Sequence, residues 1–336
     1  MYLYMLYAPS NLNPKLFDED VEQVYTRKGF GDGFVLAGEK DESIVGLCAD
    51  LTESTQMSAF KKKFPNRFVE MGVAEQNMAS VASGMAAMGK VPAITSYAMF
   101  SPGRNWEQIR TTICYNDRKV IIAGSHSGLS VGPDGGSHQA LEDIALMRVT
   151  PNMQIIYPCD VIEARKATVA AFDKKVTSSV YIRLAREKTP VITTEETPFV
   201  FGKANILYMT EGVTQGVDFD VLICATGPLV FNAIKACIEL EKTHRKKVVV
   251  INFHTIKPFD EKTLIAYAKH AQKVVTVEEH QIAAGFGSLV CEILSEQCPK
   301  PVKRIGIHDR FGQSGTPAEL MKEYKLDAGD IVKAAL

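Results

Sequence analysis

The chain has 336 residues, enough for about two domains at roughly 150 residues each. Lysine and arginine total 38 against 39 aspartates and glutamates, so the formal net charge is −1. A hydrophobic share of 46% with 23% charged residues is typical of a soluble globular protein and excludes disordered, collagen-like and disulfide-scaffold classes. The charge balance also argues against a protein that works on nucleic acid or on an anionic membrane.

The seven cysteines are an odd number and form no CxxC pair or metal-ligand spacing. Most lie in apolar runs, and unpaired thiols are typical of a reducing compartment, so we expect a cytoplasmic protein. Residues 1–8 are apolar but lack the basic start of a signal peptide, and no run reaches transmembrane length. We expect residues 1–8 to pack against another surface, such as that of a partner, and we count residues 1–19 as an N-terminal extension.

Short β-type runs alternate with helical stretches in the first half. We expect strands at 44–48, 67–69, 119–123, 154–157 and 180–184. A helix is expected from residue 74, where apolar residues recur at three- and four-residue steps. Asp160 and Glu163 have the spacing of an N-cap residue and its reciprocal partner, which predicts a helix over 160–172.

A stretch rich in threonine, glutamate and proline, residues 187–198, then interrupts the pattern. The alternation resumes with strands expected at 220–225, 247–251, 273–277 and 302–307, and helices near 229–241, 261–270 and 288–296. Such alternation predicts an α/β fold with two doubly wound, mostly parallel-sheet domains. We place these domains at residues 20–190 and 206–336, with a linker at 191–205.

Residues 125–139, here called the glycine-rich segment, contain four glycines and follow a predicted buried strand. The carboxyl end of such a strand is where open α/β sheets bind ligands. The segment also carries His126, Asp134 and His138, whose side chains suit proton transfer or substrate binding. A surface loop with incidental histidines is the plainer interpretation, and a metal site of two histidines and one carboxylate is a further alternative.

Glu75 follows a predicted strand and a glycine, and it falls in the first turn of an apolar helix. A favourable interaction of the carboxylate with the helix dipole would explain this position. Its small and apolar neighbours nevertheless predict a partly buried side chain, as in a proton-handling acid. Tyr97 and Phe100 lie in another unusual segment, residues 95–110, although such aromatic residues more often belong to a core than to a cofactor platform.

Gly31-Asp32-Gly33 matches the start of the thiamine diphosphate signature, in which an aspartate and a later asparagine hold Mg²⁺ and the diphosphate. The nearest candidate asparagine, Asn66, follows three lysines, and the expected strand–turn–helix pattern is missing. We interpret this match as a coincidence inside a helix or turn. The sequence also lacks the glycine motifs of phosphate loops and dinucleotide sites.

Five segments together resemble the transketolase family, namely residues 49–52, 72–78, the glycine-rich segment, 148–153 and 278–288. The resemblance runs in order across residues 20–336, but it covers only the pyrimidine-binding and C-terminal domains of that family. It therefore implies the C-terminal subunit of a split transketolase. The partner would be an N-terminal subunit that carries the diphosphate-binding domain.

The resemblance assigns a cofactor role to four residues. Glu75 would hydrogen-bond to N1′ of the thiamine aminopyrimidine and favour the tautomer that removes the C2 proton. Phe100 would stack on the aminopyrimidine ring, with Tyr97 as a second wall. Asp50, at the end of a strand, would lie near the cofactor.

The resemblance also assigns six residues to the sugar substrate. The side chains that would contact its hydroxyl and carbonyl oxygens are His126, Asp134 and His138, and the two histidines would also be catalytic. Those that would contact its phosphate are Arg27, Ser54 and Arg186. An arginine suits a phosphate because its planar fork donates paired, charge-assisted hydrogen bonds.

The implied activity is transfer of a two-carbon ketol unit from a ketose phosphate to an aldose phosphate. It would require thiamine diphosphate, Mg²⁺ held mainly by the partner, and an α2β2 assembly. Ser127 and Pro133 depart from the family pattern and leave the substrate range open. Alternatives are the C-terminal half of a deoxyxylulose-phosphate synthase, the β subunit of a 2-oxoacid dehydrogenase, and a non-catalytic subunit that retains the fold.

Overall fold

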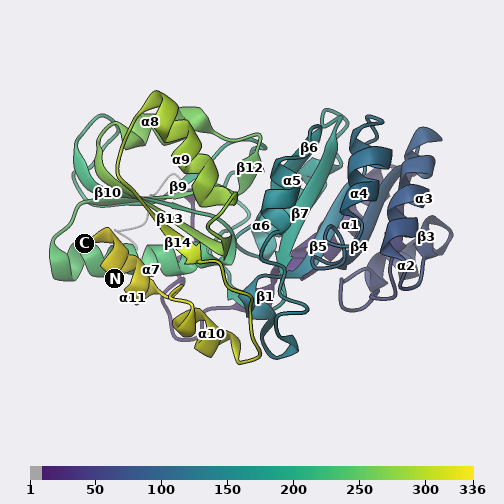
Figure 1. The fold of residues 1–336 in the computed structure, drawn as a ribbon, viewed down its shortest axis with the longest axis horizontal. Helices are drawn as coiled ribbons and strands as arrows, with labels where there is room; N and C mark the ends of the chain where they lie inside the picture. Colours follow the sequence, from purple (N-terminus) through teal and green to yellow (C-terminus); the bar gives the residue numbers. More distant parts are fainter. Residues whose placement is uncertain (1–9) are drawn as a thin grey trace.

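The computed structural model describes residues 10–336, so the predicted packing of residues 1–8 lies outside the described part. Two α/β lobes lie side by side, the first formed mainly by the N-terminal half of the chain (Figure 1). Each lobe has one mostly parallel sheet with helices on both faces, which confirms the predicted fold class. Within residues 10–336, every helix falls short of the length and apolar character needed to span a membrane.

The first lobe is built on a seven-stranded sheet with the order β12-β6-β7-β5-β4-β2-β3. Six of its strands pair in parallel, and β12 pairs antiparallel with β6 at one edge. The strands are β2 (Ile44–Cys48), β3 (Phe68–Glu70), β4 (Val91–Tyr97), β5 (Ile121–Ser127), β6 (Met153–Ile156), β7 (Ser179–Ala185) and β12 (Thr255–Lys257). The first sheet thus takes one strand from the second half of the chain.

Helices cover both faces of this sheet. One face packs on α1 (Thr26–Lys40), α2 (Ser58–Lys63) and α6 (Val161–Ala171), and the other on α3 (Glu75–Ala87) and α5 (Asp143–Arg148). A short α4 (Trp106–Gln108) continues into a π-helical turn, Ile109–Cys114, and 3₁₀ turns occur at η2 (Pro65–Arg67) and η4 (Leu129–Asp134). These helices bury the apolar side chains that alternate along the strands.

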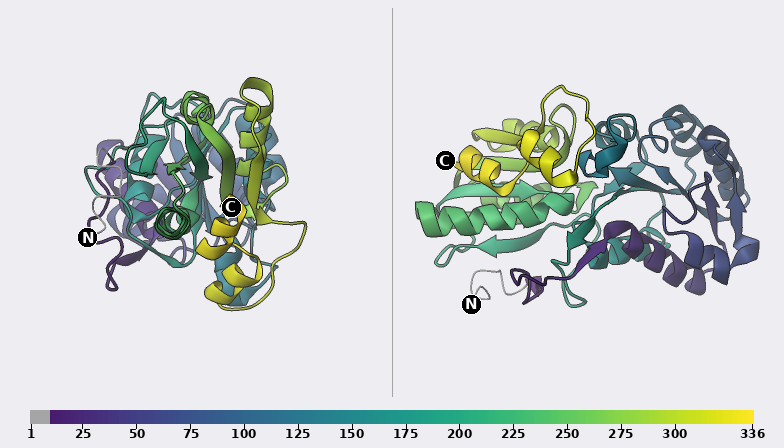
Figure 2. Two further views of the ribbon diagram at one scale, coloured as in Figure 1. Left: turned by 90° about the vertical axis from the view of Figure 1, so that its left-hand side faces the viewer. Right: turned by 90° about the horizontal axis from the view of Figure 1, so that it is seen from below.

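The second lobe has a five-stranded sheet with the order β14-β13-β10-β11-β9, in which β9 is antiparallel to its neighbour. Its strands are β9 (Asn205–Met209), β10 (Phe219–Ala225), β11 (Val248–Asn252), β13 (Ala271–Gln281) and β14 (Val302–Ile307). Its helices are η5 (Gly227–Leu229), α7 (Val230–His244), α8 (Glu261–Ala268), α9 (Phe286–Gln297), α10 (Pro317–Glu323) and α11 (Ala328–Ala335). The C-terminal α10 and α11 appear in yellow in Figure 2.

The stretch rich in threonine, glutamate and proline, residues 187–198, is partly structured. Its residues Lys188–Pro190 form β8, which pairs antiparallel with β1 (Gln23–Tyr25) in a separate two-stranded ribbon. The domain limits at 20–190, 191–205 and 206–336 stay predictions, since β12 crosses from the second half into the first sheet.

The cap of α6 differs in one detail from the prediction. Asp160 accepts a hydrogen bond from the backbone N–H of Glu163, as expected for an N-cap residue. The Glu163 carboxylate, however, accepts from the backbone N–H of Cys159 rather than from Asp160. The helix therefore begins where predicted, with the reciprocal hydrogen bond shifted by one residue.

Candidate active site

The predicted site residues gather at one edge of the first sheet. Strands β2, β4 and β5 are adjacent and parallel, so their carboxyl ends lie together. Asp50 follows β2, Tyr97 ends β4 and His126 lies near the end of β5. Glu75 begins α3, the helix that follows β3 at the same edge.

Glu75 is a buried carboxylate, with only 2% of its surface exposed, which confirms the burial predicted from its neighbours. Its Oε1 accepts a 3.4 Å hydrogen bond from Ser96 Oγ, and its Oε2 accepts a 2.8 Å hydrogen bond from the Arg104 guanidinium. Asn105 Nδ2 donates to the Glu75 backbone oxygen at 3.1 Å. The carboxylate is therefore held in one position by groups on β4 and on the turn after it.

Aromatic rings lie in contact beside this carboxylate. Tyr97 stacks on the His126 imidazole with ring centroids 3.9 Å apart, and Phe100 meets His138 edge-on at 5.4 Å. The Arg104 guanidinium lies 4.7 Å from the centre of the Phe100 ring. Tyr97 and Phe100 are half-buried rather than part of the core, and a hollow of about 350 Å³ opens beside Phe100 and Arg104.

His126 is buried at the end of β5, with its Nδ1 2.8 Å from Ser125 Oγ. Strand β5 runs to Ser127, so the glycine-rich segment starts within the strand. Burial, with the nearby cations Arg27 and Arg186, lowers the pKa of His126 to about 3. The imidazole is therefore neutral near pH 7 and offers one donor and one acceptor nitrogen.

Two arginines lie together on the other side of His126. The Arg27 guanidinium donates to the backbone oxygen of Arg186 and lies 4.0 Å from the centre of the Tyr25 ring. Arg186 lies 3.7 Å from the Asp134 carboxylate. Burial and, to a lesser degree, the neighbouring Arg186 cation lower the pKa of Arg27, so an anion bound here would offset the repulsion between the two guanidinium groups.

Asp50 and Ser54 lie on the turn after β2. The Asp50 backbone N–H donates to Glu70 Oε1 at 2.7 Å. Within residues 10–336, the side chains of Asp50 and Ser54 form no hydrogen bond or ion pair with the other predicted site residues. The structure thus places them at the same edge of the sheet without joining them to the network around Glu75.

The two departures from the family pattern have different surroundings. Ser127 is buried and donates to the Leu184 backbone oxygen at 3.1 Å, whereas Pro133 is exposed.

For the metal alternative, the part of the chain from residue 10 onward contains no cluster of three or more histidine, cysteine, aspartate or glutamate side chains placed to hold a metal ion.

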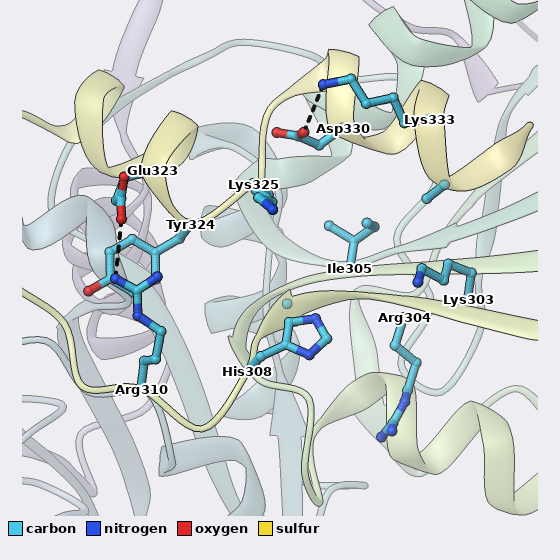
Figure 3. Close-up of a pocket in the computed structure, with 12 residues that line it drawn as sticks. Lys303, Arg304, Ile305, His308, Arg310, Glu323, Tyr324, Lys325, Asp330 and Lys333 are labelled. Carbon is cyan, nitrogen blue, oxygen red and sulfur yellow. Dashed lines mark hydrogen bonds and ion pairs between the residues drawn. The ribbon is translucent and has the colours of Figure 1, made fainter.

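A second hollow, of about 520 Å³, lies between β14 and the helices α10 and α11 (Figure 3). Its lining includes Lys303 and His308, together with the ion pairs Arg310–Glu323 at 3.2 Å and Lys333–Asp330 at 3.4 Å. The predicted site residues do not line it, so it is separate from the edge of the first sheet.

Sequence reasoning assigned no role to three residues that hold Glu75. Ser96, Arg104 and Asn105 all contact it, although they lie 21 to 30 positions away. The available signal was weak: all three lie in the segment that carries Tyr97 and Phe100, directly at the end of β4.

Comparison with known proteins identifies both lobes. Residues 22–191 match the transketolase pyrimidine-binding domain, and residues 211–331 match the transketolase C-terminal domain. The chain belongs to the transketolase family. It is 41% identical over 310 residues to a protein named putative transketolase C-terminal section from Methanocaldococcus jannaschii, covering 91% of this chain and 94% of that protein.

Two further transketolases show how much of the family architecture the chain represents. A solved structure described as an inactive β4 tetramer of a split-gene transketolase shares 39% identity with a TM-score of 0.83, covering 93% of this chain and 97% of that one. Human transketolase is 32% identical over 315 residues, which are 93% of this chain but 49% of the human protein. The chain corresponds to the C-terminal part of transketolase, as predicted.

Proposed function

We propose that this chain is the C-terminal subunit of a transketolase that transfers a two-carbon ketol unit from a ketose phosphate to an aldose phosphate. The observation that carries the proposal is the buried Glu75 carboxylate beside the half-buried rings of Tyr97 and Phe100, with the Arg27–Arg186 pair nearby. One part suits a flat, nitrogen-containing ring and the other a phosphate.

The residues at the sheet edge fit the pyrimidine half of thiamine diphosphate, the cofactor of this family. Glu75 would hydrogen-bond to a ring nitrogen, and Phe100 would stack on the ring, with Tyr97 beside it and Asp50 at the adjoining strand end. When bound, thiamine diphosphate supplies the carbanion-stabilising centre needed to break a carbon–carbon bond. Glu75 would exchange a proton with the ring nitrogen that it contacts, as a positioned acid–base group does.

On the substrate side, His126, Asp134 and His138 would contact the sugar oxygens. The neutral His126 imidazole can donate or accept a hydrogen bond, as the hydroxyl and carbonyl groups of a sugar require. For the phosphate we propose Arg27, Ser54 and Arg186, because the Arg27 guanidinium contacts the Arg186 backbone and an anion would offset the repulsion between the two cations.

We further propose that a separate N-terminal subunit holds the diphosphate and Mg²⁺, and that the two chains assemble as α2β2. The matched length supports this, since the chain corresponds to about half of human transketolase. The split-gene relative, described as inactive as a β4 tetramer, supports both self-association and the need for a partner. A cytoplasmic location is part of the proposal, because all seven cysteines are unpaired in the structure.

The proposal is tested by combining the chain with its partner polypeptide, thiamine diphosphate and Mg²⁺. We expect ketol transfer between phosphosugars by the mixture and no turnover by this chain alone. Glu75→Ala should lower kcat by about 10²- to 10⁴-fold, the range typical of a lost acid–base group. Glu107→Ala, which removes an exposed carboxylate on α4, is the matched control and should retain full activity.

Three outcomes would overturn parts of this proposal. Turnover by the isolated chain would contradict the split enzyme, and full activity of Glu75→Ala would show a non-catalytic subunit. Pyruvate decarboxylation without ketol transfer would instead favour the deoxyxylulose-phosphate synthase or 2-oxoacid dehydrogenase alternatives.

A further inference from the structure

The glycine-rich segment is held from behind by the second lobe. Its 3₁₀ turn η4 packs on α10. A Cβ at Gly132 would lie 3.2 Å from Pro317 Cδ, and one at Gly136 would lie 2.8 Å from the Gly312 backbone oxygen. The backbones approach so closely that larger residues here would push the segment and the second lobe apart.

Glu279, on β13 of the second lobe, makes the most direct polar contact with this segment. The side chain is 1% exposed, and its Oε1 accepts a 2.6 Å hydrogen bond from the Ser130 backbone N–H. The carboxyl group also fills the space in front of Gly128, where a Cβ would collide with it. Gly128 has a φ of +81°, so a residue with a side chain would be both strained and obstructed there.

Gln139 provides a second link at the other end of the segment. Its Nε2 lies 3.2 Å from the Leu129 backbone oxygen and 3.3 Å from that of Gly132, so it ties the segment to itself. The same nitrogen lies 3.0 Å from the Gln313 backbone oxygen of the second lobe. One buried amide thus joins both ends of the turn to the loop before α10.

Arg183 connects these contacts to the first sheet. This fully buried guanidinium pairs with Asp143 at 2.7 Å and donates to the backbone oxygens of Ala140 and Glu279 at 3.1 and 3.0 Å. It therefore fixes the position of Glu279 relative to β7 and to the residue that follows the glycine-rich segment. Burial raises the pKa of Glu279 and the Arg183 charge only partly offsets this rise, whereas at Asp143 the same charge acts against burial and the pKa lies below its usual value.

We propose that Glu279 and Gln139 are positioning residues for substrate binding. The glycine-rich segment, which carries His126, Asp134 and His138, rests on Glu279 and is tied to the second lobe through its own Gln139. Because the Ser130 amide and the Gly128 backbone rest on Glu279, moving that carboxyl group moves the histidines and aspartate. The second lobe thereby sets the geometry of a substrate site whose proposed contact residues all precede residue 187. The inference rests on the proposed function for its substrate and on the contacts alone for its positioning.

The test compares Glu279→Ala with Glu278→Ala in the full chain. Glu278 is a matched control because it is equally buried and accepts from two backbone N–H groups, those of Phe286 and Gly287, but within its own lobe. Amide hydrogen exchange should become at least about tenfold faster across residues 128–139 in Glu279→Ala. In Glu278→Ala the acceleration should instead appear at the start of α9.

Kinetics of the reconstituted enzyme provide the second measurement. Glu279→Ala should raise the phosphosugar KM about tenfold or more while the affinity for thiamine diphosphate stays at the wild-type value, because Glu75 and Phe100 lie on other elements. Glu279→Gln keeps an acceptor oxygen for Ser130 and should restore most of the wild-type KM. Gln139→Ala should reproduce the KM effect if it is the second support.

Each result decides the inference. Unchanged exchange in residues 128–139, or equal KM effects in Glu279→Ala and Glu278→Ala, would overturn it. Amide exchange across residues 128–139 could be slow in wild type and faster in Glu279→Ala, while the wild-type chain with its partner shows no ketol transfer. That combination would support the positioning contact and reject the proposed function. The two failures are therefore distinguishable.

Discussion

At the scale of single residues, the site contains both buried and solvent-exposed side chains. Glu75 is 2% exposed, whereas the Arg104 side chain that pairs with it is 46% exposed. The carboxylate is thus closed off from solvent on that side by one flexible side chain, which also lies over Phe100.

Buried histidines predict a measurable dependence of stability on pH. His254 is fully buried, and burial lowers its pKa to about 3. Between pH 7 and pH 5 the unfolded chain takes up a proton here that the folded chain does not, so this residue makes stability fall with falling pH, by about 2 kcal/mol. Urea unfolding of His254→Gln should show lower stability at pH 7 but a loss between pH 7 and pH 5 that is about 2 kcal/mol smaller than in wild type.

The comparison must be made between variants, because other groups act in the opposite direction. Burial raises the pKa of Glu163 and Glu278 to about 7, so the folded state holds protons that the unfolded state releases, and these two residues favour folding as the pH falls towards 5. His308→Gln, at an exposed position, is the control and should follow the wild-type pH dependence. An equal loss of stability in His254→Gln and wild type would contradict the prediction.

Residue-level predictions from sequence succeeded where the chemistry is local. The small neighbours of Glu75 indicated its burial, and the spacing of Asp160 and Glu163 indicated a helix start. The contacts that fix the site were not predictable in this way. Glu279 lies 149 positions from Ser130, and no spacing rule connects a strand of one lobe to a turn of the other.

At the scale of elements, buried strands were the most predictable features. The expected bounds of β2 and β14 coincide with the structure. Strand β2 is apolar and buried along its whole length, as expected for a strand covered on both faces, whereas the edge strand β14 is fully buried only in its last three residues. Strand β4 was not predicted, although it lies inside the first sheet between β5 and β2 and ends at Tyr97. Its sequence, V-P-A-I-T-S-Y, has a proline at its second position and ends with polar residues that pack only in the assembled sheet.

The Gly31-Asp32-Gly33 match lies inside α1, as interpreted from the sequence, and the structure explains both glycines by packing. A Cβ at Gly33 would lie 2.7 Å from the Arg165 backbone oxygen of α6, and one at Gly31 would lie 2.5 Å from the Gln56 backbone oxygen. Asp32 is on the exposed side and pairs with Lys28. The motif therefore allows a helix to pack closely on its neighbours.

This packing predicts that Gly33→Ala destabilises the chain by about 1–3 kcal/mol, because α1 and α6 must separate to admit a methyl group. Gly84→Ala is the matched control, since it lies in helix α3 with no atom within 4 Å of the added Cβ. That variant should gain about 0.5–1 kcal/mol from the better helix propensity of alanine. Urea unfolding of both variants measures the difference, and equal stabilities would contradict the close α1–α6 contact.

At the scale of the whole molecule, the two lobes share one apolar core and are linked by a strand from the second half of the chain that completes the first sheet. One continuous apolar core includes Ile144 and Met147 from the first half of the chain and Phe253 and Ile256 from the second. Strand β12 belongs to the second half of the sequence but to the first sheet. The two halves are thus joined by packing and by pairing as well as by the chain.

We therefore predict that the full chain unfolds in a single cooperative transition. Separating the lobes would remove β12 from its sheet and would take the Glu279 backbone acceptor away from the fully buried Arg183, which would keep its ion pair with Asp143. A hydrogen bond to a charged group contributes about 1.5–3 kcal/mol, and a buried donor left without its acceptor is costly. Neither lobe should outlast the other on heating, so calorimetry should show one peak with a ratio of calorimetric to van't Hoff enthalpy of about 1. Two resolved peaks would show that the lobes are independent, and the support that Glu279 gives to the glycine-rich segment would then be lost at the lower transition.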